Sequence, residues 1–464
     1  MSDLLSPQDI IGAGLCIGCG SCVAQAAKPS EPAMRMAFDR YGQLKPLGPA
    51  AWRLAKSESF TRTCPFSPAA PNEDELAARF GAPAQRTALL GSFEKAYVGH
   101  VAEGDFRPCG SSGGLVTWVA TELLRQGLID GVAHVAAVEN PAAEGRFFRY
   151  CLARTEAEVR AGARSRYYPI ELSEVLQAMR ATPGRYAVVG LPCFIKAVQL
   201  LRREDPVLRE RIVFTLGLFC GHLKSARFAE SFAWQLHAPL GQVQQVEYRE
   251  KLPDRPANWY RAQLTLRDGR QLSRDWWHLA DGDWGAGFYM NSACNFCDDV
   301  VAETADIAFG DAWVEPYSSD GRGTNVVIVR SPLVQQLVAR AIQAGRLALT
   351  EVDAEFVEQT QAAGFRQRRE GLAYRLTWAR HGRVRPRKRV APGAALPRHR
   401  KLIYRLRAFI AAASHRVFWA ARVVRRPGLF LGWARAVLAV YHGVAYHQGK
   451  VGEMWARWKG LGQE

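Results

Sequence analysis

The sequence predicts a mixed α/β (α+β) protein with a small N-terminal module, a central α/β body and a basic helical C-terminal extension. Three observations lead to this fold class. Residues 1–70 are weakly periodic and rich in Gly, Pro and Cys, residues 90–355 alternate strand-like apolar runs with helical periodicity, and residues 366–464 are strongly basic. We expect the central body to divide into two parts, residues 90–180 and 181–355.

The N-terminal module carries the most specific motif of the chain. Cys16, Cys19 and Cys22 are each separated by two residues, and Cys64 follows later with a proline directly after it. Three thiolates at this spacing can face one iron–sulfur cube, and a Cys-Pro is the usual form of the fourth ligand. The glycines between them allow tight turns that point N–H groups at the sulfurs. The motif predicts a ferredoxin-like 4Fe–4S module and makes electron transfer the first hypothesis.

The α/β body is predicted from the order of its apolar runs and turn residues. A short helix over 73–80 lies in the linker that precedes it. The pattern then predicts strands over 96–101, 132–138, 186–189, 212–218, 306–309 and 325–330, and helices over 115–126 and 194–203. Residues 243–274 are expected to form a β-hairpin excursion with its turn at Asp268-Gly269.

Four further cysteines come from three segments of the body. They are Cys193, Cys220, Cys294 and Cys297. The first two follow apolar strands, and the carboxyl ends of parallel strands meet at one ligand-binding edge. A single cysteine is more often a buried small hydrophobe, but a Cys-x-x-Cys pair with two more favours a second cluster, with zinc as the competing metal. Cys109 and Cys151 have no partner at ligand spacing and are expected to be structural.

A glycine-rich loop and a basic aromatic segment are the candidates for flavin binding. Ser111, Ser112, Gly113 and Gly114 open a predicted helix, where free N–H groups could bind a pyrophosphate. Helix capping with glycines for close packing explains this loop equally well. Ser165, Arg166 and Tyr167 combine a hydroxyl, a cation and an aromatic face that could hold a phosphate or stack a ring, although a surface cluster is the commoner explanation.

Two ionisable residues are candidates for the chemistry itself. His222 follows Cys220 and could donate a proton during reduction, or could hydrogen-bond to a backbone carbonyl. Lys196 lies one turn after Cys193 and could favour a reduced, anionic flavin, or could be a solvated helix lysine.

The charge of the chain is concentrated in its tail. From Arg366 onward there are 23 Lys and Arg residues and 3 Asp and Glu residues, a net charge of +20, whereas the rest has a net charge of −3. Arginines interrupt both apolar stretches of the tail, 402–424 and 429–446, so neither is expected to span a membrane. The tail could lie on anionic lipid or pack on the body or on another subunit, and no nucleic-acid motif is present.

The N-terminus and the cysteine usage favour a reducing compartment. The first fifteen residues include Asp3 and Asp9 and lack the basic start of a signal peptide. Clustered cysteines in such a chain indicate metal binding rather than a disulfide framework. We expect a cytoplasmic protein, with peripheral contact to the inner face of the membrane through 366–464 as a further expectation and with homo-oligomerisation left open.

These motifs together resemble the beta subunit of the coenzyme F420 hydrogenase/dehydrogenase family. The resemblance rests on the two cysteine motifs, Ser-Ser-Gly-Gly, Ser-Arg-Tyr, Gly-Leu-Pro-Cys-Phe-Ile-Lys and Phe-Cys-Gly-His, in order from about residue 10 to about residue 350. It implies FAD and one or two 4Fe–4S clusters. It assigns one cluster to Cys16, Cys19, Cys22 and Cys64, the other to Cys193, Cys220, Cys294 and Cys297, and flavin contacts to Ser112, Gly113, Gly114, Arg166, Tyr167 and Asn325.

The function implied is that of an iron–sulfur flavoprotein oxidoreductase. Electrons would pass from ferredoxin or a reduced deazaflavin through 4Fe–4S to FAD and on to an organic substrate. Relatives beside sugar-polymer biosynthesis make a polysaccharide or lipid-linked glycan intermediate a candidate substrate. The alternative is a non-catalytic electron-transfer beta subunit of a larger hydrogenase or dehydrogenase complex.

Overall fold

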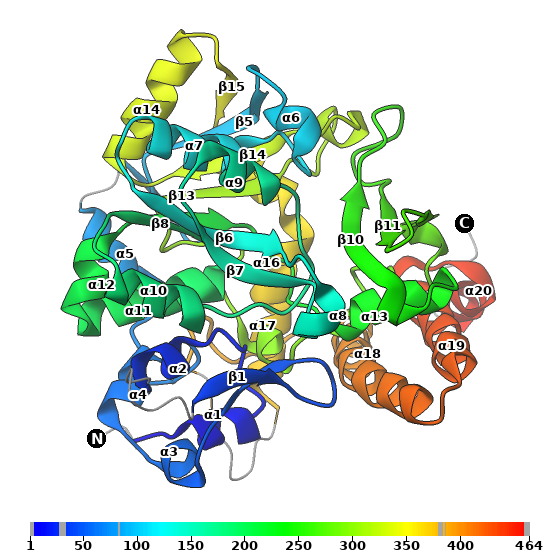
Figure 1. Ribbon diagram of the computed structural model, residues 1–464. Helices are drawn as coiled ribbons and strands as arrows, with labels where there is room; N and C mark the ends of the chain where they lie inside the picture. The colour runs from blue at the N-terminus through cyan, green and yellow to red at the C-terminus, as the bar shows by residue number, and fades with distance from the viewer. Residues whose placement is uncertain (1–3, 27–33, 82–83, 379–383, 386, 459–464) are drawn as a thin grey trace.

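A mixed eight-stranded sheet forms the centre of the molecule (Figure 1). The computed structural model describes all residues except 1–3, 27–33, 82–83, 379–383, 386 and 459–464. The strand order is β15-β5-β14-β13-β9-β8-β6-β7. The strands are β5 (Lys95–Val101), β6 (Gly131–Ala137), β7 (Phe148–Ala153), β8 (Tyr186–Gly190), β9 (Ile212–Leu218), β13 (Ile307–Asp311), β14 (Asn325–Val329) and β15 (Leu347–Val352). The predicted α/β class and the six predicted strands are confirmed.

The direction of the strands brings distant segments to one edge of the sheet. β6, β8, β9 and β13 are mutually parallel. β14 is antiparallel to both β13 and β5, so β5 runs in the same direction as the parallel strands. The carboxyl ends of these five strands and the amino end of β14 therefore lie at a common edge, where ligands bind in open α/β sheets.

Helices cover both faces of this sheet. One face packs against α7 (Leu115–Arg125), α9 (Glu156–Ala161) and α14 (Pro332–Gln343), and the other packs against α10 (Ser173–Ala181), α11 (Pro192–Glu204) and α12 (Pro206–Arg211). α11 begins two residues before the predicted start at 194, because Pro192 has no N–H and a φ angle suited to the first helical position. Cys193 therefore lies in the first turn of a helix and not in the preceding loop.

The N-terminal module packs below α10 and α11 (Figure 1). It contains α1 (Pro7–Gly12), α2 (Ser21–Ala26), β1 (Arg35–Phe38), β2 (Leu44–Leu47), α3 (Ala50–Leu54) and α4 (Glu58–Thr63). α2 contacts both α10 and α11, and α4 contacts α11. The predicted linker helix is present as α5 (Glu73–Ala77), extended by a 3₁₀ turn over Ala78–Phe80.

The predicted hairpin excursion is a separate three-stranded antiparallel sheet. Its strands are β10 (Val243–Glu250), β11 (Arg261–Leu266) and β12 (Gln271–Asp275). β11 and β12 pair around the predicted turn, where Gly269 has a φ of +85° that favours glycine. β10 is the additional strand, and its Tyr248 is fully buried.

The C-terminal extension is helical, as predicted, and packs on the body. α15 (Ala354–Thr360) precedes it, and the extension begins within α16 (Ala362–Arg368) and continues through α17 (Glu370–Leu376), α18 (Arg398–Val423), α19 (Pro427–Tyr446) and α20 (Gly449–Trp458). α18 and α19 pack against each other at the outer edge of the molecule (Figure 1). By length and composition alone, α19 is apolar enough to cross a membrane. Within its most apolar 18-residue segment, 28% is buried inside the protein.

Candidate functional site

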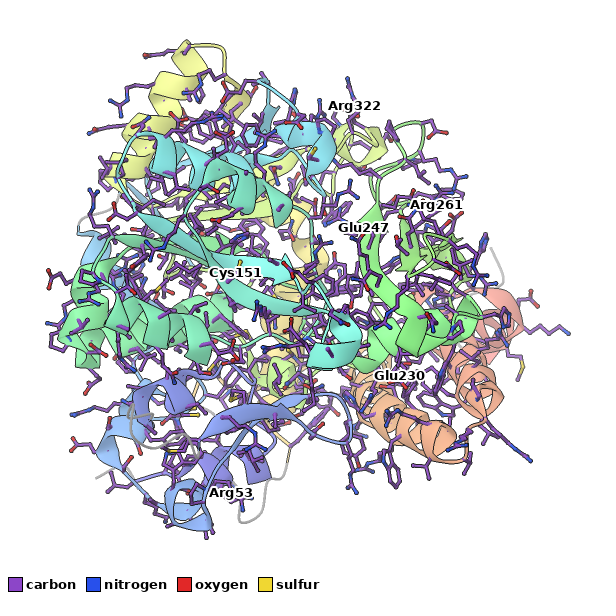
Figure 2. The ribbon with its side chains drawn as sticks, viewed as in Figure 1. Arg53, Cys151, Glu230, Glu247, Arg261 and Arg322 are labelled. Carbon is purple, nitrogen blue, oxygen red and sulfur yellow. The ribbon has the colours of Figure 1, made fainter. Side chains whose placement is uncertain are left out.

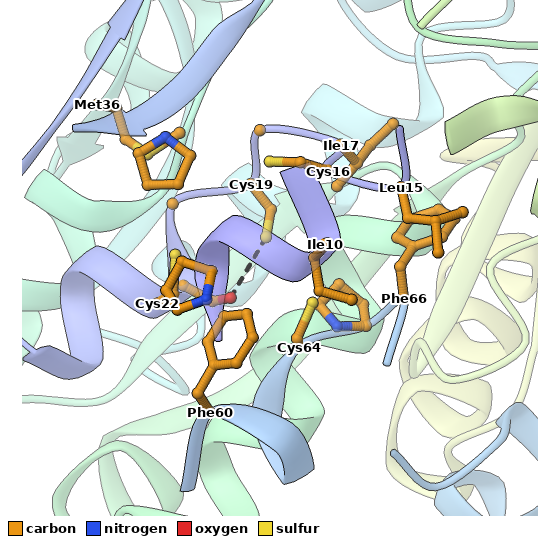
Figure 3. Close-up of a pocket in the computed structure, with 16 residues that line it drawn as sticks. Ile10, Leu15, Cys16, Ile17, Cys19, Cys22, Met36, Phe60, Cys64 and Phe66 are labelled. Carbon is orange, nitrogen blue, oxygen red and sulfur yellow. Dashed lines mark hydrogen bonds between the residues drawn. The ribbon is translucent and has the colours of Figure 1, made fainter. Parts of the chain in front are cut away.

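The four cysteines of the N-terminal motif line one pocket. Figure 3 shows the side chains of Cys16, Cys19, Cys22 and Cys64 around a common space. They come from the loop before α2, from α2 itself and from the end of α4. Apolar side chains close the pocket, namely Ile10, Leu15, Phe60 and Phe66. The structure thus brings together the complete set of predicted ligands for the first cluster.

The backbone around this pocket depends on two glycines. Gly18 and Gly20 have φ angles of +83° and +80°, which L side chains rarely adopt. A Cβ atom at Gly18 would lie 2.6 Å from the carbonyl oxygen of Leu44. Both glycines therefore fix the turn that presents Cys19 between its two neighbours.

The electrostatics of the first group fit a metal-bound state. Burial raises the pKa of the Cys19 thiol to about 11 and raises the pKa of Cys64 further. Burial and then the neighbouring Cys19, Cys16 and Cys64 raise the pKa of Cys22. The thiols of Cys19, Cys22 and Cys64 resist ionisation and need a nearby positive charge to become thiolates, and iron in a cluster would supply it.

The second group of cysteines is also assembled by the fold. Cys193 begins α11 after β8, Cys220 follows β9, and Cys294 and Cys297 lie at a 3₁₀ turn over Ser292–Phe296. The pKa of Cys193 is raised by burial and then by Cys297, Cys220 and Cys294, so the three other thiols lie near it. The N–H of Leu223 donates to the sulfur of Cys294 at 3.3 Å. The fold thus brings Cys193, Cys220, Cys294 and Cys297 near one another, and their role as ligands of a second cluster stays a prediction.

The cysteines carry no disulfide, and the two remaining ones lie apart from both groups. All ten cysteines are free. Cys109 is exposed at the end of α6 (Phe106–Cys109), and Cys151 lies on β7 (Figure 2). Within the described ranges, no three His, Cys, Asp or Glu side chains have the arrangement that a single metal ion requires.

The two cysteine groups are neighbours. Cys19 of the first group contributes to the raised pKa of Cys193 in the second. Tyr150 is affected by both, because burial and then Cys193, Glu171 and Cys19 raise its pKa. The contact of α2 with α11 produces this proximity. Sequence reasoning assigned the two groups but had no signal for their adjacency.

Hydrogen bonds to Ser165, Thr324 and Asn325 hold the glycine-rich loop and the start of α7 in place. Ser111 Oγ accepts the N–H of Ser165 at 2.8 Å, and Ser112 Oγ donates to the carbonyl oxygen of Thr324 at 2.9 Å. Asn325 Oδ1 accepts the N–H of Leu115 at 3.2 Å, which caps α7 from a neighbouring strand. The residue before α7 is Gly114 in the left-handed region, with no side-chain cap of its own. The structure therefore joins the Ser111, Ser165 and Asn325 segments at the common edge.

Gly113 is tightly packed against two strands of the central sheet. A Cβ atom there would lie 2.7 Å from the carbonyl oxygen of Gly99 and 2.8 Å from Asn325 Oδ1. Lys251 fixes the same loop, since its Nζ donates to the carbonyl oxygen of Ser112 at 2.7 Å. Lys251 was not predicted, because a lysine directly after a strand belongs to no motif that marks it.

Arg166 and Tyr167 extend the site from the loop toward the aromatic residues. Arg166 forms an ion pair with Glu247 of β10 at 3.1 Å. Tyr167 packs against Trp284 with ring centroids 4.8 Å apart and against Trp276 at 5.7 Å. Trp276 and Trp284 therefore form an aromatic wall beside Tyr167.

His222 lies on the other side of this aromatic wall. Its ring stacks on Trp284 at 4.2 Å with an interplanar angle of 23°. The side chain is buried, and neither ring nitrogen has a hydrogen-bond partner in the described part of the chain. Burial, then Lys224 and two arginines, lower its pKa well below the ordinary value, so the ring is neutral. An orphaned buried imidazole fits a site completed by a bound group.

A buried lysine beside this wall was not predicted. Lys224 is fully buried, its Nζ donates to the carbonyl oxygen of Phe288 at 2.9 Å, and it lies 4.7 Å from the ring centroid of Trp284. Burial lowers its pKa to about 7. No sequence signal separates this lysine from a solvated one, because only packing removes it from water.

Lys196 has a charged partner instead of solvent. Its Nζ lies 3.0 Å from Glu73 Oε1, and both side chains are buried. Glu73 also faces Arg389 of the extension, which pairs with Glu303 at 2.6 Å, and Lys388 pairs with Asp298 at 3.1 Å. The solvated-lysine interpretation is wrong, and a role for Lys196 beside a flavin stays a prediction.

The mixed sheet, with cysteine-bearing and glycine-rich segments gathered at one edge, defines an α/β protein of the cofactor-binding class. The chain belongs to the coenzyme F420 hydrogenase/dehydrogenase beta subunit family. The model of the family's beta subunit N-terminus matches residues 96–177, and the model of its C-terminus matches residues 184–355. Hydrogenases and dehydrogenases are oxidoreductases, so this membership gives the chain an oxidoreductase role in electron transfer.

A solved structure agrees with this fold. The chain is similar to a component of the F420-reducing NiFe hydrogenase complex from Methanosarcina barkeri, solved as a xenon derivative. The two share 18% sequence identity with a TM-score of 0.50, and the match covers 65% of this chain and 99% of the other. At this identity the likeness concerns the fold. No curated protein matches the sequence.

Proposed function

We propose that this chain is an iron–sulfur flavoprotein oxidoreductase that takes electrons from ferredoxin or a reduced deazaflavin and delivers them to an organic substrate. The observation that carries the proposal is the convergence of eight cysteines into two adjacent groups of four, linked through Cys19 and Cys193. The family membership supports it, because it places the chain among redox subunits.

The residues of the chain have separable roles in this proposal. When bound, 4Fe–4S clusters supply single-electron transfer and FAD pairs the electrons for two-electron chemistry. Cys16, Cys19, Cys22 and Cys64 would hold one cluster, and Cys193, Cys220, Cys294 and Cys297 would hold the other. The Ser111–Gly114 loop would bind the flavin phosphates, and Tyr167 and Trp284 would exclude water from the space beside His222.

An anaerobic purification followed by iron, sulfide and released-flavin quantitation on one sample tests this proposal. About eight iron atoms and one FAD per chain are expected for two cubanes and a flavin. About four iron atoms per chain would contradict a second 4Fe–4S cluster, and zinc found in addition would indicate that the second cysteine group binds zinc. Iron without flavin would contradict the assignment of the Ser111–Gly114 loop. The lipid-linked glycan class inferred from the resemblance is the first substrate class to assay.

A second candidate function is electron transfer inside a larger complex, without turnover of its own. The observation that favours it is the match to a component of a hydrogenase complex, which spans 99% of that component. Turnover by the isolated chain with a reduced donor would exclude this alternative. Activity that appears only after co-purification with a partner would establish it.

A further inference from the structure

The α18–α19 hairpin is anchored to the body by one face. Phe418 of α18 stacks on Trp234 at 4.1 Å, and Ser414 Oγ accepts the N–H of Tyr289 at 2.9 Å. His442 of α19 lies 2.7 Å from Asp283. These contacts fix the orientation of both helices, so the opposite face is held outward.

The outward face is apolar where the two helices meet. Trp419, Val423, Val424 and Leu429 are 37%, 61%, 53% and 55% exposed. We call these four residues the hairpin tip. Beyond it, α19 presents Gly432, Ala436, Ala439 and Val440 outward, with Arg435 as its one Lys, Arg, Asp or Glu residue. Exposed apolar residues grouped in this way mark an interaction surface.

The hairpin tip is surrounded by arginines without acidic partners. Arg416, Arg425 and Arg426 are exposed, and none of them has an ion-pair partner among the described residues. Arg422, on the anchored side, differs because it pairs with Glu230 at 2.8 Å. The sequence contains no Asp or Glu between Glu370 and Glu453.

The shape of the tip favours a lipid surface over a protein. The turn between α18 and α19 projects at the outer edge of the molecule (Figure 1). A protein partner would need a concave pocket to bury two adjacent valines and a tryptophan between arginines. A bilayer surface receives a projecting tip without such a pocket, places tryptophan at the headgroup level and attracts arginine to anionic phosphates.

We propose that the hairpin tip docks this protein on anionic phospholipid, with Trp419, Val423, Val424 and Leu429 at headgroup depth and Arg416, Arg425 and Arg426 over the phosphates. The proposal does not depend on the cofactors or on the substrate. It places the protein peripherally on a membrane and not across it, because Phe418, Phe430 and Ala434 pack on the body.

Sedimentation of the full-length protein with vesicles tests this docking. Vesicles of phosphatidylcholine alone are compared with an equal mixture of phosphatidylcholine and phosphatidylglycerol. We expect binding to the mixed vesicles only, and a loss of binding as salt is added. Absence of binding to the mixed vesicles would overturn the proposal, as would equal binding to both compositions.

Paired variants locate the contact. Val423→Glu with Leu429→Glu should abolish binding, whereas Leu333→Glu, at a residue that is 45% exposed on α14, should leave it unchanged. Arg425→Gln with Arg426→Gln should weaken partitioning by about thirtyfold, whereas Arg267→Gln with Arg270→Gln at the β11–β12 turn should not. Unfolding curves identical to wild type confirm that each variant is folded.

Two further outcomes would overturn the assignment of the hairpin tip as a lipid-binding surface. Equal losses in the tip variants and in their controls would show nonspecific adsorption and overturn the proposal. A defined acidic protein that binds the wild type and not the tip variants, together with no vesicle binding, would make the tip a protein interface and overturn lipid docking.

Discussion

Arg368 donates from Nη2 to the carbonyl oxygen of Cys220 at 2.8 Å. The same guanidinium donates to the carbonyl oxygen of Gly221 at 2.7 Å and to that of Cys294 at 3.4 Å. One buried arginine of α16 thus joins two of the three segments that carry the second cysteine group. It lies beyond residue 355, where the family match ends, so the extension takes part in the candidate site.

Replacing Arg368 should change the redox potential of the second group. Arg368→Gln removes a buried positive charge beside the proposed cluster, and a reduced cluster carries more negative charge than an oxidised one. We expect the midpoint potential to fall by about 60 mV, equivalent to a tenfold change in a one-electron equilibrium. A redox titration followed by electron paramagnetic resonance measures it.

Arg366→Gln is the matched control, because Arg366 lies on the same helix and is exposed. Its potential should match that of the wild type. An unchanged potential in Arg368→Gln with a full iron content would show that the arginine only holds the backbone.

Removal of one cysteine ligand should eliminate one proposed cluster and leave the other in place. Cys193→Ser takes one thiol from the second group only, so iron should fall from about eight to about four atoms per chain while the first cluster persists. Cys109→Ser, at an exposed cysteine outside both groups, should retain all iron. Complete loss of iron in Cys193→Ser, with an unchanged circular dichroism spectrum, would show that the two groups are not independent.

A methyl group at Gly113 should disturb the glycine-rich loop. In Gly113→Ala the new Cβ meets Gly99 and Asn325, both on strands of the central sheet that cannot move easily. We expect a loss of about 1 to 3 kcal/mol in the free energy of unfolding and a lower flavin content. Urea unfolding and released-flavin fluorescence measure these two effects.

The control for this change is Gly432→Ala, where no atom lies within 4 Å of the new methyl group. It should be neutral or slightly stabilising, because alanine favours the helix. Normal stability in Gly113→Ala together with normal flavin content would contradict both the packing argument and the proposed loop function.

The buried Lys224 should make stability depend on pH. Its folded pKa of about 7 lies below the ordinary 10.5, so the unfolded chain binds more protons between these values. The free energy of unfolding should therefore rise with pH across that window, by roughly 5 kcal/mol from this group. Urea unfolding at a series of pH values should show the rise in the wild type and a smaller one in Lys224→Met. Parallel curves for the two proteins would mean that Lys224 is not desolvated.

Composition identified the extension as strongly basic and left open whether it packs on the body, and the structure shows that part of it does. Lys388 and Arg389 belong to this basic extension, yet both side chains are largely buried against carboxylates of the body, Asp298 and Glu303 among them. These acidic partners precede the two basic residues by more than eighty positions, so no local pattern couples them. The net charge of a sequence segment therefore does not distinguish basic residues in solvent from basic residues buried against carboxylates.

The sequence by itself determined the elements and the identity of the cysteine groups. Apolar periodicity located β5, β8, β9 and α7, and the spacing of Cys16, Cys19 and Cys22 marked the first group, because both depend on neighbouring residues alone.

Only the tertiary structure decided which of these groups are neighbours. The adjacency of Cys19 to Cys193, the stacking of His222 on Trp284 and the contact of Arg368 with Cys220 all arise from packing between distant segments. Burial of side chains in such contacts also sets the charge state of His222 and Lys224, since desolvation depends on surrounding atoms that a linear sequence does not specify.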